Sequence, residues 1–278
     1  MISEVSRVAA IKDHRVRVKE AVQLMEELQA AVVETSRMRK ESIAWLRQNG
    51  LSMAEVAKLM GVSRARVAQL KDAGPPAERA FLGVDRVAVA VPQRPGERDY
   101  VAVEDSATGQ QLINLAHRLQ LDGELEYIPT TGAIDLNRDG LVVVCGPKTS
   151  PITAAALAGD PRLSFETLAD GRWALIDRES GQTITSPTDD PEAPRPADVA
   201  YLGRLPRPDG AGTFLLVAGV HAVGSLGVAR YLSENVAELY GEVGSEPFSM
   251  VIGCDFEVGT KRVLATQALT DVLRHEAA

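Results

Sequence analysis

The sequence has little cysteine and no long apolar run, and both absences narrow the classes of protein to which it can belong. Its only cysteines, Cys145 and Cys254, lie in short apolar runs, where a free thiol behaves as a small hydrophobic group. Neither belongs to a closely spaced metal-ligand pattern, so we expect two buried, reduced thiols and no metal site. No apolar run approaches the ~20 residues of a transmembrane helix, and the first residues are too polar for a secretory signal. We therefore expect a cytoplasmic protein.

A repeat of fixed period is also missing, which argues against a solenoid. The 278 residues exceed a typical single domain of roughly 100 to 200 residues, so two unequal domains are expected. A composition of 45% hydrophobic and 24% charged residues is typical of a soluble globular protein. Residues 1–74 carry thirteen Lys or Arg against nine Asp or Glu, although the net charge of the chain is −8. Only this N-terminal part is suited to bind a polyanion.

Residues 1–74 are expected to be almost wholly helical. Apolar residues at three- and four-residue steps predict an amphipathic helix over residues 15–33, with a stripe made of Val18, Val22, Met25, Leu28 and Val32. This stripe predicts either a dimer seam or packing within its own domain, and both readings stay open. A second helix is predicted from Thr35 or Ser36, capped by the hydroxyl, to Asn49-Gly50. It would bury Ile43, Trp45 or Leu46.

The stretch from Leu51 to Gly74 predicts two short helices joined by a tight turn. Ser52 can cap the first helix, with Glu55 completing a capping box, and Gly61 permits the turn. Ser63 can cap the second helix, which is predicted from Arg64 to about Lys71. The expected buried set is Val56, Ala57, Met60, Val62, Val67 and Leu70.

Because Ala57, Gly61, Val67 and Leu70 occupy this spacing, residues 36–72 resemble the helix-turn-helix of bacterial transcriptional regulators, and also the region-four segment of sigma factors. The resemblance implies that the second helix enters the major groove of double-stranded DNA. Its base-reading side chains would be Ser63, Arg64, Arg66 and Gln69. Arginine can pair with a guanine edge and glutamine with an adenine edge. A helical hairpin used only for protein contact is the alternative.

Three basic residues near the start of the second predicted helix, Arg37, Arg39 and Lys40, are candidates for phosphate contacts. An ordinary solvated helix face explains them equally well. A single motif of this kind covers a short half-site, so a homodimer that reads two half-sites is expected.

The helical pattern ends at Pro75 and Pro76, which places a linker at residues 75–85. Beyond it, residues 86–278 hold β-rich runs at 86–91, 140–146, 214–219 and 248–256. They alternate with helical segments near 105–119, 151–159 and 225–239. This alternation predicts a Rossmann-like α/β domain, so the expected fold class is an all-helical domain followed by an α/β domain. The acidic, proline-rich segment 186–198 is predicted to be a solvated loop, with a functional lid as the alternative.

Two strand-to-helix junctions in this second domain are candidate ligand-binding loops. In the first, Gly146, Lys148, Thr149 and Ser150 precede a helix start that can hold an anion. A plain capped turn, with Ser150 as N-cap, explains this loop equally well. The second loop contributes His221, Gly224 and Ser225. Such loops emerge on the same edge of a parallel sheet, so we expect them to share one pocket.

The second loop departs from three known motifs. Ser225 stands where a phosphate loop needs lysine, and the glycine spacing differs from the dinucleotide-binding fingerprint. Ser225, Asp255 and His275 follow the chain order of an α/β-hydrolase triad, but Val223 replaces the first glycine of its nucleophile elbow. We therefore expect no catalytic residue here, and the sequence names no cofactor.

Together these features predict a cytoplasmic, homodimeric, DNA-binding transcriptional regulator. Its C-terminal domain is predicted to sense a small ligand that is anionic or nucleotide-like. Two alternatives stay open: this domain is a nucleotide- or ester-acting hydrolase tethered to a DNA-binding module, or it is an oligomerisation domain without a ligand.

Overall fold

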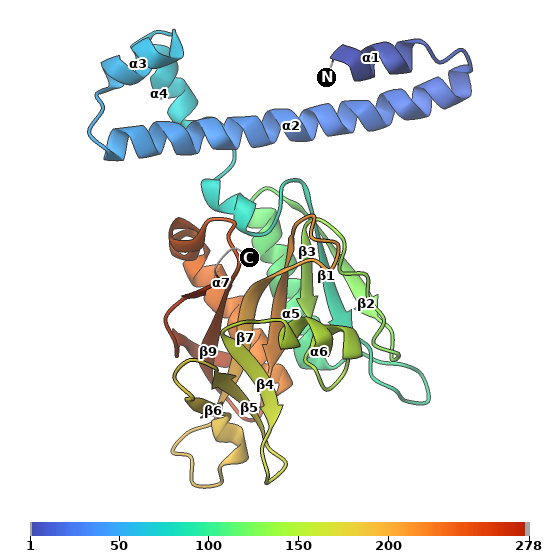
Figure 1. The fold of residues 1–278 in the computed structure, drawn as a ribbon, viewed down its shortest axis with the longest axis vertical. Helices are drawn as coiled ribbons and strands as arrows, with labels where there is room; N and C mark the ends of the chain where they lie inside the picture. The colour runs from blue at the N-terminus through green and yellow to red at the C-terminus, as the bar shows by residue number, and fades with distance from the viewer. Residues whose placement is uncertain (1, 276–278) are drawn as a thin grey trace. The chain divides into compact units, whose positions relative to one another are not determined.

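The computed structural model describes residues 2–275 and divides into two compact units, with the boundary along the chain between Ala77 and Glu78. The first unit is helical (Figure 1). It contains α1 (Ile2–Ala9), α2 (His14–Gln48), α3 (Met53–Met60) and α4 (Arg64–Asp72). The second unit is a mixed α/β domain built on a large mixed sheet.

Helix α2 is continuous over 35 residues, so the predicted break near Thr35 is wrong. The Thr35 hydroxyl donates to the carbonyl of Ala31 at 2.7 Å, within the helix, and does not cap a new one. No glycine or proline occurs between His14 and Gln48 to interrupt the backbone. The helix ends where the sequence predicts, at Asn49, and Gly50 follows with a φ of +92°.

The capping and turn interactions that the sequence predicts around α3 and α4 are present in the structure. Ser52 Oγ accepts from the Glu55 N–H, and the Glu55 carboxylate accepts from the Ser52 N–H at 2.7 Å, which completes the predicted capping box. Gly61 adopts the left-handed conformation at φ +66°, and the chain turns there. Ser63 Oγ then accepts from the N–H of Arg66 at 3.1 Å and starts α4.

A small core joins α2 to α3 and α4. Its buried members are Ile43, Val56, Ala57, Val67 and Leu70. Leu46 and Met60 are only partly buried. Of the three alternatives Ile43, Trp45 and Leu46, Ile43 is the buried residue, whereas Trp45 is 60% exposed. The prediction for Val62 is wrong, because this residue is 36% exposed. Trp45 follows Ile43 by two residues, a rotation of about 200°, and so points away from this core.

The sheet of the second unit orders its strands as β10 (Val263–Ala268), β9 (Phe248–Phe256), β7 (Ala197–Pro206), β8 (Thr213–Gly219), β3 (Leu141–Val144), β1 (Arg86–Pro92) and β2 (Asp122–Ile128). A short strand, β11 (Leu273–Arg274), also pairs with β9. Strands β2, β1, β3 and β8 run parallel, whereas β7 is antiparallel to both β8 and β9. A separate small sheet holds β4 (Leu163–Thr167), β5 (Trp173–Asp177) and β6 (Thr183–Thr185).

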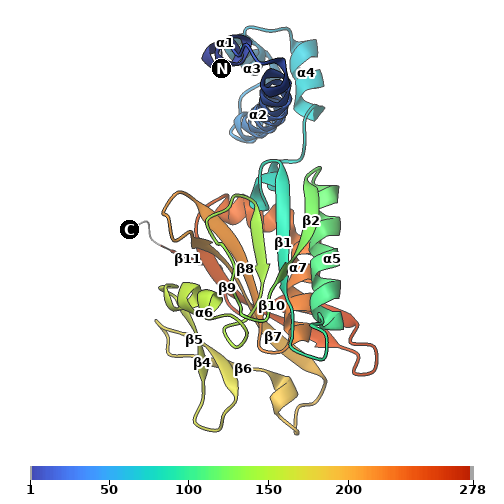
Figure 2. The same ribbon diagram turned by 90° about the vertical axis from the view of Figure 1, so that its right-hand side faces the viewer.

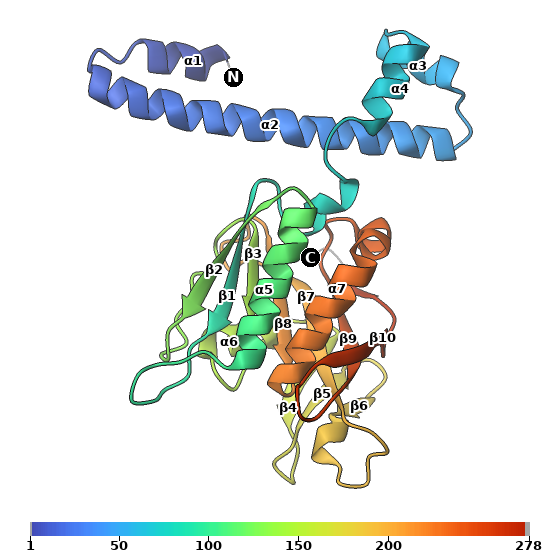
Figure 3. The same ribbon diagram turned by 180° about the vertical axis from the view of Figure 1, so that it is seen from behind.

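Two layers cover the large sheet. Helices α5 (Val103–Arg118) and α7 (Ala222–Val243) lie side by side on one face (Figure 3). Helix α6 (Pro151–Ala158) and the small sheet lie on the other face (Figure 2). The side chains of β1 alternate accordingly: Val87, Val89 and Val91 join the core under α5 and α7, whereas Ala88 and Ala90 join the opposite core.

The predicted strand runs correspond to β1, β3, β8 and β9, but the other described strands escaped prediction, with β2 and β7 of the large sheet among them. Strand β2 has acidic residues at every second position at the sheet edge, and only Ile128 in it is buried. Strand β7 contains Asp198 as its second residue and also Arg204, and both are buried. The predicted loop 186–198 is exposed in its middle, but the prediction fails at its ends, where Ser186 and Asp198 are buried.

Both cysteines are free and buried, as the sequence predicts. Burial raises the pKa of the Cys145 thiol to about 11 and that of Cys254 to about 12. Among residues 2–275, no helix is long and apolar enough to cross a membrane.

Helix α7 passes so close to β9 that its packing can be tested with alanine. A methyl group on Gly227 would lie 2.6 Å from both Cβ and Sγ of Cys254. We expect Gly227→Ala to lower the free energy of unfolding by about 1–3 kcal/mol. Gly241→Ala, on the same helix with nothing within 4 Å, should instead leave it unchanged or raise it by up to about 1 kcal/mol. Urea unfolding of both variants gives the comparison, and equal stabilities would contradict this packing.

Candidate functional site

The first candidate site is an exposed row of polar side chains at the start of α4. Its members are Ser63, Arg64, Arg66 and Gln69, all exposed. On the same helix Val67 and Leu70 are buried in the core of the helical unit. The guanidinium of Arg66 donates to Gln69 Oε1 at 3.2 Å, so these two side chains lie together on the free side of the helix.

The neighbouring basic residues of α2 differ from one another. Arg37 is buried and paired with Glu34 and Glu41, each at 2.7 Å, so its candidacy as a phosphate contact is withdrawn. Burial and two carboxylates make it a structural ion pair. Arg39 and Lys40 are half-buried, and Lys40 Nζ lies 3.4 Å from the Gly74 carbonyl oxygen. Their contact with phosphates stays a prediction.

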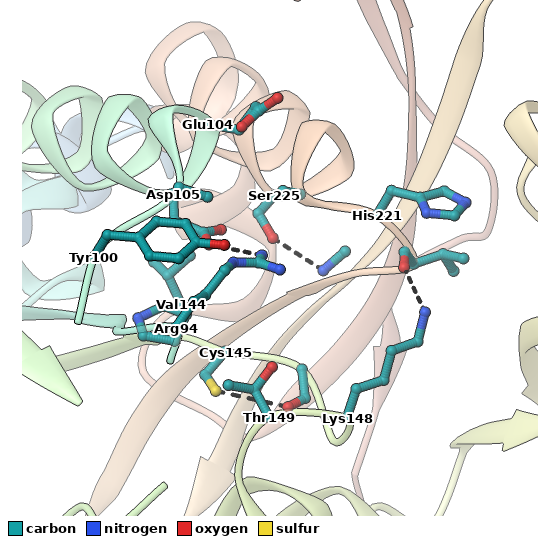
Figure 4. A pocket seen from close by; sticks show the side chains of 16 residues that line it. Arg94, Tyr100, Glu104, Asp105, Val144, Cys145, Lys148, Thr149, His221 and Ser225 are labelled. Carbon is teal, nitrogen blue, oxygen red and sulfur yellow. Dashed lines mark hydrogen bonds and ion pairs between the residues drawn. The ribbon is translucent and has the colours of Figure 1, made fainter. Parts of the chain in front are cut away.

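The second candidate site is a pocket of about 430 Å³ at the carboxyl ends of β1, β3 and β8 (Figure 4). The chain leaves β1 through α5 toward β2, whereas β3 and β8 extend the sheet on the other side of β1. The point where connections diverge in this way is where α/β sheets usually bind ligands. Both predicted loops line this pocket, as the strand-to-helix pattern predicts.

Five of the seven predicted ligand contacts line the pocket: Gly146, Lys148, Thr149, His221 and Ser225. Ser150 does not, because its buried hydroxyl caps α6 and donates to the Gly132 carbonyl at 2.6 Å. Gly224 does not either, because it packs on β7, where a Cβ would lie 2.6 Å from the Val199 carbonyl oxygen. Both residues serve the structure and are withdrawn as ligand contacts.

The start of α7 is occupied by a residue that sequence reasoning missed, the buried carboxylate of Asp198. Its Oδ2 accepts from the N–H groups of His221 at 3.2 Å and Gly224 at 2.7 Å. Its Oδ1 accepts from the Ser186 hydroxyl at 2.6 Å and the Val199 N–H at 2.9 Å. Burial raises the pKa of Asp198, and these hydrogen bonds oppose that shift. A carboxyl group of the protein itself therefore fills the helix N-terminus that the sequence suggests for a ligand.

The side of the pocket next to α5 carries charged residues that were also missed. Figure 4 shows Arg94, Tyr100 and Asp105 grouped there. Arg94 follows the end of β1, and its Nη2 donates to Asp105 Oδ2 at 3.0 Å, while its buried Nε has no partner among the described residues. Burial raises the pKa of Asp105, and the bond from Arg94 opposes this. Arg94 could be found from the sequence only as a residue just past a predicted strand.

The opposite side holds Lys148 and His221. Lys148 Nζ donates to the carbonyl of Val220 at 3.0 Å and lies 5.2 Å from the Trp173 ring centre. Burial lowers the pKa of Lys148, and the charges of Asp189 and Asp198 oppose this. His221 Nε2 lies 2.9 Å from Asp189 Oδ1, so a residue near the start of the 186–198 segment contacts this lining residue although it does not line the pocket itself.

The glycines of the two pocket loops differ in whether the surrounding packing leaves room for a side chain. A Cβ on Gly219 would lie 2.8 Å from the Ser225 backbone nitrogen, so packing requires glycine there. A Cβ on Gly146 would meet only the Gly219 carbonyl oxygen, at 3.7 Å. Packing therefore does not require glycine at position 146. The missing side chain leaves uncrowded backbone on the pocket wall, which a ligand can approach.

The three residues of the hydrolase alternative have separate partners. Ser225 Oγ accepts from the Gly219 N–H at 3.0 Å. Asp255 pairs with Arg195 at 3.0 Å. His275 Nε2 lies 3.0 Å from Ser249 Oγ, and burial lowers its pKa. The arrangement therefore lacks the hydrogen-bonded chain of a nucleophile and its base.

Comparison with protein-family models, curated proteins and solved structures finds no match to this chain. The assignment of a function therefore depends on the geometry of the two sites. Within residues 2–275, no group of three His, Cys, Asp or Glu side chains is placed to hold a metal ion.

The role of Asp198 in building the pocket can be tested by Asp198→Asn. The amide keeps the shape but turns an N–H donor toward groups that are themselves donors, so we expect the free energy of unfolding to fall by about 1–3 kcal/mol. Glu192→Gln, an exposed change in the same loop, should have no such effect. Chemical denaturation measures both, and wild-type stability of Asp198→Asn would contradict the role of the carboxylate.

Proposed function

We propose that this chain is a DNA-binding transcriptional regulator whose α/β unit binds a small anionic ligand. The exposed polar row of α4 carries the proposal. Ser63, Arg64 and Arg66 stand at the start of a helix whose other side is buried. That is the end of a recognition helix that meets base edges in the major groove.

The surroundings of α4 support this reading. Helix α3, the left-handed Gly61 and α4 have the order and short connection of a helix-turn-helix. Arginine and glutamine are the side chains that pair bidentately with guanine and adenine. The excess of basic residues in 1–74, within an otherwise acidic chain, favours a polyanionic partner for this unit.

The pocket supports ligand binding by the second, Rossmann-like unit. Arg94 and Lys148 bring positive charge from the ends of two different strands, and Asp105 lies beside Arg94. A ligand with an anionic group and an N–H or O–H donor matches both signs of charge, and a small nucleotide has both. The volume of about 430 Å³ lies within the range of small-molecule sites. We do not propose a hydrolase, because Ser225, Asp255 and His275 have separate partners.

DNA reading is tested with the double variant Arg64→Ala, Arg66→Ala. Selection from a random duplex pool gives the preferred site, and a mobility shift assay gives the affinity. We expect each lost base contact to cost about 1–3 kcal/mol of binding, with the fold unchanged, because both side chains are exposed. Arg15→Ala, an exposed arginine at the other end of α2, should keep more of the affinity. Unchanged affinity of the double variant would refute base reading by α4.

Ligand binding is tested by thermal shift with inorganic phosphate and nucleoside mono- and diphosphates. A ligand at 100 times its Kd stabilises the native state by about 2.7 kcal/mol. We expect Lys148→Ala to reduce the shift that the wild type shows. Lys261→Ala is the matched control, because Lys261 lies outside the pocket, over the Phe256 ring. The absence of any shift in the wild type, or an equal shift in Lys148→Ala, would contradict the assignment.

A further inference from the structure

Helix α2 carries an apolar stripe that its own unit leaves uncovered. The fractional exposures are 59% for Val18, 51% for Val22, 59% for Met25 and 67% for Val32, with Leu28 half-buried beside them. Exposed apolar side chains at helical spacing over four turns are unusual on a monomer. They need a covering partner.

The two neighbours of α2 cover other parts of it. Arg7 of α1 pairs with Glu20 at 3.0 Å, and Glu20 is about 200° around the helix from Val18. Downstream, the chain after α4 crosses α2 at Ser36, because a Cβ on Gly74 would lie 3.1 Å from the Ser36 carbonyl oxygen. Ile43 lies on the same face of α2 as Met25 and is buried in the core that α2 shares with α3 and α4. The uncovered window therefore runs from Val18 to Val32.

The spacing of the stripe is symmetric about Met25. From Val18 the steps are four, three, three and four residues, so Val18 and Val32 lie equally far from Met25, as do Val22 and Leu28. A second α2 laid antiparallel on the first would place Met25 against Met25 of the partner subunit. It would also place Val18 against the partner subunit's Val32. Two-fold symmetry requires this reciprocal matching.

Charge favours the antiparallel direction. Arg15, Arg17 and Lys19 make the first turns of α2 basic, and parallel pairing would bring both basic ends together. In the antiparallel pair, the partner subunit's Glu26 lies about 7.5 Å along the helix from Lys19, on the same flank of the stripe.

We propose that two copies of this chain associate through an antiparallel pair of α2 helices centred on Met25. One consequence rests on the proposed function. Ile43, which packs with α4, lies 18 residues from Met25, about 27 Å along the helix. The two reading helices would then be roughly 54 Å apart, so the half-sites should be separated by more than one DNA turn of ~34 Å.

Engineered cysteines test this pairing without DNA. The native cysteines are buried, and a disulfide needs Cα atoms within about 7 Å. Met25→Cys should form a cross-linked dimer under mild oxidation, and so should the double variant Val18→Cys, Val32→Cys. Val18→Cys alone should not, because its two copies would be about 21 Å apart. Cross-linking of Val18→Cys alone would overturn the antiparallel direction, and no cross-linking of Met25→Cys would overturn the seam.

Light scattering of the full chain tests the seam independently. We expect a wild-type dimer and a monomer for Val22→Glu, Met25→Glu, since both positions are exposed in the single chain and a charge there opposes only association. Met38→Glu is the matched control: Met38 is 51% exposed on the opposite side of α2 and should leave the dimer intact. A dimer that survives the double change, or a monomeric wild type, would overturn the proposal. Neither experiment uses DNA, so their failure is distinct from a failure of DNA reading.

Discussion

The carboxylate of Asp198 is the interaction on which the pocket of the α/β unit depends. It is buried and accepts from Ser186 in the loop, from Val199 in β7, and from two N–H groups at the start of α7. Four donors on one carboxylate fix three segments that are distant in the sequence. A neutral side chain could not balance the partial positive charge of the α7 start in the same way.

This arrangement decides where a ligand can find positive charge. With the α7 start neutralised from inside, the cations available to a ligand are Arg94 and Lys148 on opposite sides of the pocket. Arg94 donates to the buried carboxylate of Asp105, and Lys148 donates to a carbonyl and lies near an indole ring. Gly146 adds uncrowded backbone between them. A ligand that spans the pocket would contact both cations at once.

Local signals were readable from the sequence, whereas long-range partners were not. Ser52, Glu55, Gly61 and Ser63 act on neighbours within a few residues, so their capping and turning roles were predicted correctly. The strand-to-helix pattern also brought the two loops to one pocket. The role of Asp198 depends on residues 12 to 26 positions away, within a segment that reads as solvated loop. Thr35 shows that a local signal can also mislead. A hydroxyl that can cap a helix can also donate to a carbonyl within one, as Thr35 does.

The helical unit separates two tasks along α2. Its C-terminal third packs with α3 and α4, of which α4 carries the polar row, whereas its middle exposes the symmetric apolar stripe. In the proposed regulator, the stripe sets the distance between two reading helices and α4 reads the bases. This proposed division would account for a helix of 35 residues in a 77-residue unit.

Photo-cross-linking from α4 tests the central claim most directly. A photoreactive aromatic residue in place of Gln69, irradiated in complex with the selected duplex, should cross-link to bases within the protected site. The same residue at Met38, on the side of α2 away from its core, should give little cross-linking. Base cross-links from position 69 are the predicted result. A bound duplex that cross-links from position 38 and not from position 69 would contradict DNA reading by α4.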